Sequence, residues 1–166
     1  MRHKARTPSG PQLSHIHQEP GKLLRAINLV PTWIFKLRLG RLFGSRFAMI
    51  THRGRKSGAL HTVITETAEG SVDSGTLIYI VAYGTRAQWY KNLEASPAVS
   101  IEIAGKVYNA PRHEFLDRAA TERAIASYWA RYPRIAGLLA RNGVFFYPGP
   151  LIDHPYAPTS VAVYLE

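Results

Sequence analysis

Residues 47–67 read FAMITHRGRKSGALHTVITET, and this stretch decides the fold. Residues 47–51 form a short run of the kind that favours a strand, and residues 60–67 alternate with the period of a second strand. Between them, residues 53–58 combine three cations with two glycines and a serine. The stretch therefore predicts two neighbouring strands joined by a basic loop.

Outward from this stretch, further strand and helix signals follow one another closely. Strands are predicted at residues 76–83, at 99–103 and 106–115 on either side of the turn Ala104-Gly105, and at 160–165. Helices are predicted at residues 88–95, from the N-cap Asp117 to about residue 131, and at 135–141. Strands that follow one another through hairpins, with helices outside them, predict an α+β fold built on an antiparallel barrel of about six strands with flanking helices.

The N-terminal third is basic and divides into two segments. Residues 1–20 have little to pack and are predicted to form a flexible basic arm, followed by a single domain over residues 21–166. Residues 22–41 have apolar side chains at helical spacing with a break or kink at Pro31. This helix either caps the barrel or lies on an anionic membrane surface as a peripheral contact, and both roles stay open.

Composition narrows the classes of function. The chain has no cysteine, which excludes disulfides and thiol chemistry and fits a cytoplasmic protein, and it has no apolar run of the roughly 20 residues that span a bilayer. The formal net charge of +10 indicates an anionic partner, which is a nucleic acid, an acidic membrane or a phosphorylated small molecule. The pair His15 and His17 lacks acidic or thiol companions, so no metal site is predicted.

The loop at residues 53–58 has the residue types that bind phosphate. Its glycines allow backbone N–H groups to converge, Arg53 and Arg55 can fork onto phosphate oxygens, and Lys56 adds a point charge. It is not a Walker A loop, because Arg55 separates Gly54 from Lys56 and a strand follows. Taken alone, such a loop is also an ordinary solvated hairpin turn.

A second motif makes the pattern more specific. Residues 51–58 (THRGRKSG) are followed at residues 89–97 by WYKNLEASP. This ordered pair resembles the signature of the deazaflavin-dependent nitroreductase family, and the resemblance extends over about residues 45–135.

The resemblance implies a split β-barrel related to flavin-mononucleotide-binding oxidoreductases, with the deazaflavin coenzyme F-420 in a groove. Flavin mononucleotide (FMN) stays open as an alternative ligand. The implied coenzyme-binding residues are those of the basic loop, the end of the strand beside the ring, and the following helix, namely Arg53, Gly54, Arg55, Lys56, Ser57, Tyr83, Gly84, Trp89 and Asn92. Two of these have structural alternatives, because Trp89 can be a core anchor and Asn92 can brace the loop.

The implied reaction is hydride transfer from the reduced coenzyme to an electron-poor acceptor, for which the protein supplies orientation, exclusion of water and a proton donor. Tyr128 and Tyr132 are the candidate donors, because a phenol can give up a proton and both lie on the helix expected beside the groove. Both tyrosines are equally plausible as structural residues.

The chain departs from the nitro-reducing members of that family after Pro133, where Ile135 stands near the place of an expected second tyrosine. The substrate side becomes more apolar, which favours a quinone or an enone over a nitro compound. A non-catalytic carrier of a lipid, or of the coenzyme itself, in the same groove stays open as an alternative. Aromatic residues are not interleaved with the cations, so nucleic acid is not expected as a partner. The chain is a monomer or a homodimer.

Overall fold

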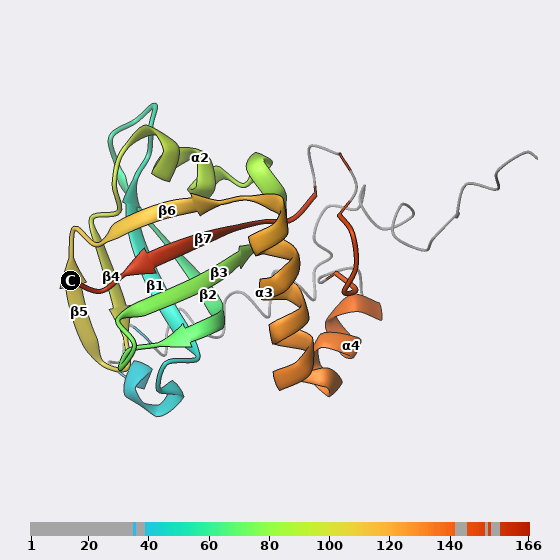
Figure 1. Cartoon of the computed structure of the whole chain (residues 1–166). Helices are drawn as coiled ribbons and strands as arrows, with labels where there is room; N and C mark the ends of the chain where they lie inside the picture. Colours follow the sequence, from blue (N-terminus) through green and yellow to red (C-terminus); the bar gives the residue numbers. More distant parts are fainter. Residues whose placement is uncertain (1–34, 36–38, 142–145, 152, 154–156) are drawn as a thin grey trace, which may run out of the picture.

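The computed structural model describes residues 35, 39–141, 146–151, 153 and 157–166, and its core is one curled antiparallel sheet (Figure 1). The predicted basic arm at residues 1–20 lies outside the described residues, as does most of the helix expected at residues 22–41. The end of that segment forms a short 3-10 helix, η1, at Leu39–Phe43.

The predicted stretch of strand, loop and strand is confirmed. Strand β1 spans Phe47–Arg53 and pairs antiparallel with β2 at Leu60–Ser71, with Phe47 opposite Glu66 and Arg53 opposite Leu60. Strand β3 follows at Thr76–Val81. A short 3-10 helix, η2, at Gly84–Arg86 then leads into α2 at Gln88–Ala95, the helix predicted for those residues.

The predicted hairpin after α2 is also present, but its second strand is shorter than expected. Strand β4 (Ser100–Ile103) pairs with β5 (Lys106–Asn109), whereas residues 112–116 form a separate strand, β6 (Arg112–Leu116). The prediction of one strand over residues 106–115 is therefore wrong. The break falls at Ala110, whose φ of 46° is left-handed and incompatible with a strand, and it raises the strand number from six to seven.

This break is also what curls the sheet. The strand order is β5-β4-β1-β2-β3-β7-β6, where β7 spans Thr159–Tyr164. Strands β5 and β6 thus lie at the two edges of the sheet, yet only two residues of chain join them. The edges must therefore come close together, which closes the sheet into a split β-barrel (Figure 1).

The remaining helices cover one outer face. Helix α3 (Arg118–Arg131) begins at the predicted N-cap Asp117, whose carboxylate accepts a hydrogen bond from the Ala120 N–H at 2.7 Å. It packs against β2, β3 and β7, and α4 follows at Pro133–Arg141 (Figure 1). Pro133 starts α4 two residues earlier than predicted, because proline is tolerated in the first helical turn.

Both faces of β3 are covered, which explains why its sequence is almost continuously apolar. Leu77, Tyr79 and Val81 face the barrel interior, while Ile78 and Ile80 pack outside against the cluster under α3 and α4. Among the described residues, no helix has the length and apolar character needed to cross a membrane.

Candidate functional site

The basic loop between β1 and β2 is a tight turn with its own hydrogen bonds. The Gly54 N–H donates to the Ala59 carbonyl at 2.8 Å, and the Gly58 N–H donates to the Gly54 carbonyl at 2.7 Å. Gly58 has a φ of +68°, a left-handed conformation that glycine adopts without strain. The Ser57 hydroxyl accepts from the Ala59 N–H at 3.3 Å, so the turn has a fixed shape with its cationic side chains outside.

An open groove of about 500 Å³ lies beside this loop. Its walls come from β1, the loop, the start of β2 and helix α2, and its lining residues are His52, Gly54, Arg55, Lys56, Ser57, His61, Thr62, Val63, Gln88, Trp89 and Asn92. The groove therefore unites six of the predicted coenzyme-binding residues from two motifs about 30 residues apart in the chain. Of the other three, Arg53, Tyr83 and Gly84, none lines this groove.

Asn92 ties α2 to the basic loop. Its side-chain oxygen accepts hydrogen bonds from the Arg55 backbone N–H at 3.2 Å and from the Arg55 guanidinium at 3.0 Å. A second guanidinium nitrogen of Arg55 donates to the Gln88 side chain at 3.0 Å. Asn92 therefore braces the basic loop, which is the structural role that the sequence left open for it. These hydrogen bonds also fix the position of Arg55, one of the predicted coenzyme-binding residues.

The amide nitrogen of Asn92 points the other way, to His52. Asn92 Nδ2 lies 3.1 Å from His52 Nδ1, and both side chains are buried. Burial lowers the pKa of His52 below its usual range, and the neighbouring His61 lowers it further. The imidazole of His52 is stacked on that of His61, its register partner on β2, with 5.9 Å between ring centroids.

The cations of the loop have no carboxylate partners in the described part of the chain. The guanidinium of Arg53 donates to the Gly58 carbonyl at 3.3 Å, and Arg55 contacts only neutral amides in its side-chain hydrogen bonds. The ion pairs of the described residues lie elsewhere, between Arg46 and Glu66, Arg112 and Glu166, and Arg118 and Asp153. A positive field at the groove therefore remains available to an anion.

Trp89 and Val63 give the groove an apolar portion. Both are partly buried and pack against the barrel core, and both line the groove. For Trp89 the two alternatives thus coincide, because the same ring anchors α2 and presents a surface to the groove.

Tyr83 and Gly84 lie at the end of β3, where η2 begins. Tyr83 is 42% exposed, and its partial burial raises the pKa of its phenol. Gly84 is buried and has a φ of 55°. Their predicted place beside the coenzyme ring stays a prediction.

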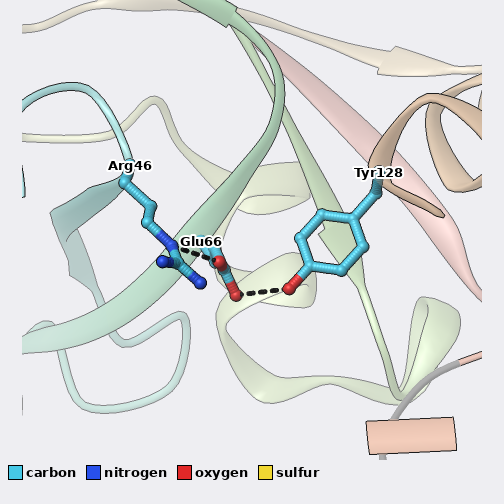
Figure 2. A network of polar contacts seen from close by, with 3 residues as sticks. All are labelled: Arg46, Glu66 and Tyr128. Atoms are coloured by element: carbon cyan, nitrogen blue, oxygen red, sulfur yellow. Dashed lines mark hydrogen bonds and ion pairs between the residues drawn. The ribbon is translucent and has the colours of Figure 1, made fainter. Parts of the chain in front are cut away.

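Of the two candidate proton donors, Tyr128 belongs to a separate polar network with Arg46 and Glu66 (Figure 2), and Tyr132, the C-cap residue of α3, packs beside it. The Tyr128 hydroxyl donates to Glu66 Oε2 at 2.8 Å, and Arg46 Nε donates to Glu66 Oε1 at 2.7 Å. The Tyr132 ring packs on Tyr128 at 5.3 Å, and the Arg46 guanidinium lies 4.7 Å from the centroid of the Tyr132 ring. Neither tyrosine lines the groove described above.

Burial raises the pKa of the Tyr128 phenol, and the Glu66 carboxylate raises it further. The Tyr128 proton is therefore held between two oxygens inside the protein, whereas no such carboxylate contact is present for the Tyr132 hydroxyl among the described residues.

Five groove residues were not predicted from the sequence, namely His52, His61, Thr62, Val63 and Gln88. A signal for His52 was present: Ala48 and Ile50 face inward on β1, and the strand period of two continues that face to residue 52. A histidine on a core-facing position needs a polar partner, and Asn92 is that partner.

Comparison with known proteins gives one family match. The sequence model described as "F420H(2)-dependent quinone reductase" matches residues 35–136. No curated protein matches the chain.

Solved structures with a similar fold include an F420-H2-dependent reductase, FDR-A, with 21% identity and a TM-score of 0.49, covering 71% of this chain and 93% of that chain. Another, described as a domain-swapped dimer, has 20% identity and a TM-score of 0.49 and covers 80% of this chain and 98% of that one. A pyridoxamine 5'-phosphate oxidase-related, FMN-binding protein from Nostoc punctiforme has 12% identity and a TM-score of 0.43, with coverage of 90% and 82%.

Proposed function

This chain belongs to the F420H(2)-dependent quinone reductase family and is a deazaflavin-dependent oxidoreductase, and we propose that the groove beside α2 holds the phosphate end of its coenzyme F-420. The family assignment favours an oxidoreductase over the carrier that the sequence left open. The observation that carries the proposed placement is that Arg55 and Lys56, which line the groove, have no carboxylate partners among the described residues.

The residues fit a phosphate in both charge and geometry. Arg55 uses two of its five N–H groups on Asn92 and Gln88, which fixes the guanidinium plane and leaves three N–H groups for phosphate oxygens. Lys56 is exposed and lines the groove, so its ammonium can move onto the same anion.

The apolar portion of the groove suits the ring system. Trp89 and Val63 can support a flat aromatic ligand and exclude water from one of its faces. When bound and reduced, the coenzyme supplies a hydride to an electron-poor acceptor. We extend the proposal to an apolar acceptor such as a quinone, which is supported by Ile135 near the place of the expected second tyrosine after Pro133.

Reduction of a quinone also needs a proton, and Tyr132 is the better of the two predicted donors. The hydroxyl of its neighbour Tyr128 donates a hydrogen bond to Glu66, so the Tyr128 proton points into the protein (Figure 2). The guanidinium of Arg46 over the Tyr132 ring would stabilise the phenolate left after donation.

The binding part of the proposal is tested by titrating the protein with coenzyme F-420 and following fluorescence. Replacing Arg55 and Lys56 together with alanine should cost on the order of 2 to 4 kcal/mol of binding free energy through lost charge-assisted contacts. Lys106→Ala is the matched control, because Lys106 is an exposed cation on β5 outside the groove. Equal affinities for the double variant and the control would show that the phosphate lies elsewhere.

A peripheral contact with the inner face of the membrane through residues 22–41 completes the proposal, supported by the basic, apolar pattern of that segment and the formal net charge of +10. The full chain should float with vesicles rich in anionic lipid, and a chain starting at residue 35 should not. Equal flotation of both chains would remove this segment from the proposal.

A further inference from the structure

We propose that His52 is a positioning residue that holds Arg55 in its coenzyme-binding geometry through Asn92, and that it does so only while its imidazole is neutral. This inference rests on the proposed placement of the coenzyme phosphate at Arg55. The coenzyme-binding geometry of the loop then depends on whether a buried imidazole, 4% exposed, is neutral or protonated.

The orientation of the Asn92 amide follows from its partners. Arg55 approaches Asn92 Oδ1 with its backbone N–H and with its guanidinium, and both of these groups can only donate. The atom they share must therefore be the amide oxygen, which leaves the NH₂ group facing His52.

That orientation fixes the tautomer of His52. An NH₂ group can only donate, so His52 Nδ1 at 3.1 Å must accept and carries no proton. The imidazole is then neutral, with its proton on Nε2. A second proton, on Nδ1, would place the N–H of His52 against the NH₂ group of Asn92, so that two donors face each other. If the Asn92 amide flipped to relieve this, its NH₂ group would instead face the two Arg55 donors, the backbone N–H and the guanidinium. Protonation of His52 and fixation of Arg55 thus exclude each other.

The charged groups around His52 favour the neutral form. From β2, His61 stacks on the ring, and from the loop, Arg55 stands behind Asn92. Helix α2 contributes the neutral amide of Asn92, and on the β4 side the Val99 N–H donates to the carbonyl of Thr51, the residue before His52. Burial and His61 lower the pKa of His52 and outweigh a hydrogen bond with the Arg53 backbone that raises it, and no carboxylate of the described residues adds to that rise.

The test is the pH dependence of the dissociation constant (Kd) for coenzyme F-420, measured by calorimetry from about pH 8 to about pH 5, a range that spans the usual histidine pKa. We expect the wild-type Kd to rise about tenfold on acidification, the size of one lost hydrogen bond to a charged group. His52→Asn keeps an acceptor near the position of Nδ1 but cannot be protonated there, so whatever its Kd at pH 8, that Kd should not rise on acidification.

A control variant and the sign of the effect separate His52 from other histidines. His113 also lies under α2 but outside the groove, so His113→Asn should leave the pH profile of Kd unchanged. His61 lines the groove, and a proton there adds positive charge and tightens binding of an anion, which is the opposite sign. The same acid-dependent rise in His52→Asn and in wild type would overturn the inference while leaving coenzyme binding in place.

A second measurement does not depend on any variant. Nitrogen-15 NMR of the histidine side chains in the wild-type protein should show His52 as the neutral tautomer protonated at Nε2 at about neutral pH. A proton on Nδ1 would contradict the inference directly. Absence of any coenzyme binding at pH 8 would remove the proposed function and this inference with it, whereas an Nδ1 proton together with tight binding removes only the latter.

Discussion

The Tyr128 hydroxyl on α3 donates a hydrogen bond of 2.8 Å to the Glu66 carboxylate on β2, and this bond ties the outer helix to the sheet (Figure 2). Tyr128 is 2% exposed, so water does not readily replace the partner of its phenol. The pairing distinguishes Tyr128 from the other predicted proton donor, Tyr132, which lies four residues later at the C-cap of α3.

Tyr128→Phe and Tyr132→Phe should therefore separate stability from activity. Tyr128→Phe loses a buried hydrogen bond to a carboxylate and should lower the free energy of unfolding by about 1 to 3 kcal/mol, with little change in kcat. Tyr132→Phe should lower kcat by about 100-fold or more, the usual contribution of a general acid. Denaturant unfolding and quinone-reduction kinetics check the pair, and a normal kcat in Tyr132→Phe would leave the proton to solvent.

Glu66→Gln should destabilise the fold without affecting coenzyme affinity. The substitution leaves the Arg46 guanidinium without its counter-charge, but the Arg46 and Glu66 side chains keep 33% and 20% of their surface exposed, so water screens part of the loss. We expect about 1 to 2 kcal/mol less unfolding free energy. A double-mutant cycle with Arg46→Gln isolates the pair, and a coupling energy near zero would contradict this account.

Arg55→Lys should weaken coenzyme binding although it preserves the charge. A lysine ammonium cannot reproduce the planar fork that bonds Asn92 and Gln88 while presenting further N–H groups to the groove. An increase in Kd of about tenfold is expected, against a smaller one for Lys56→Arg, where no fixed partner is lost. Equal effects would mean that only charge matters at this loop.

Two glycine substitutions should affect different properties, one mainly coenzyme binding and the other mainly stability. A Cβ at Gly54 would lie 2.7 Å from Ser57 Oγ and 2.9 Å from His61 Nε2, side-chain atoms of the groove that can rotate away. Gly54→Ala should thus impair coenzyme binding more than folding. At Gly70, with a φ of +89°, a Cβ would overlap the Thr76 backbone carbonyl, so Gly70→Ala should cost about 3 kcal/mol or more of stability. Calorimetric binding and thermal unfolding of both variants check the contrast.

Stability should fall as the solution is acidified below the usual histidine pKa. Burial lowers the pKa of both His52 and His113 in the folded chain, while the unfolded chain keeps the ordinary value of about 6.5. Between that value and the folded pKa, the unfolded chain binds more protons, so the free energy of unfolding decreases with falling pH. Above about pH 6.5 these two groups are neutral in both states and contribute no slope.

His113→Asn should flatten part of this acid-dependent loss and His52→Asn another part. Denaturant unfolding at a series of pH values measures both slopes. A wild-type slope of the opposite sign over that range would show that other groups dominate.

The sequence predicted α2 to the residue and united the basic loop with Trp89 and Asn92, because the periodicity and the motif order both depend on local residue types. It did not predict the break between β5 and β6. Ala110 itself has no feature that marks a φ of 46°, but Pro111 directly after it is a signal of a strand break that the prediction passed over, because proline cannot donate to a strand ladder. The part of His52 in the site also escaped prediction, because the contact with Asn92 joins residues 40 positions apart.

Strand β7 at Thr159–Tyr164 lies beyond residue 136, where the family match ends, yet it sits between β3 and β6. Until β7 is inserted, β6 has no neighbour in the sheet and β3 has a bare edge, so closure must wait for a pairing of large sequence separation. Such open edges template association with other chains. The protection of this protein from aggregation during folding therefore depends on a strand that lies outside the family match.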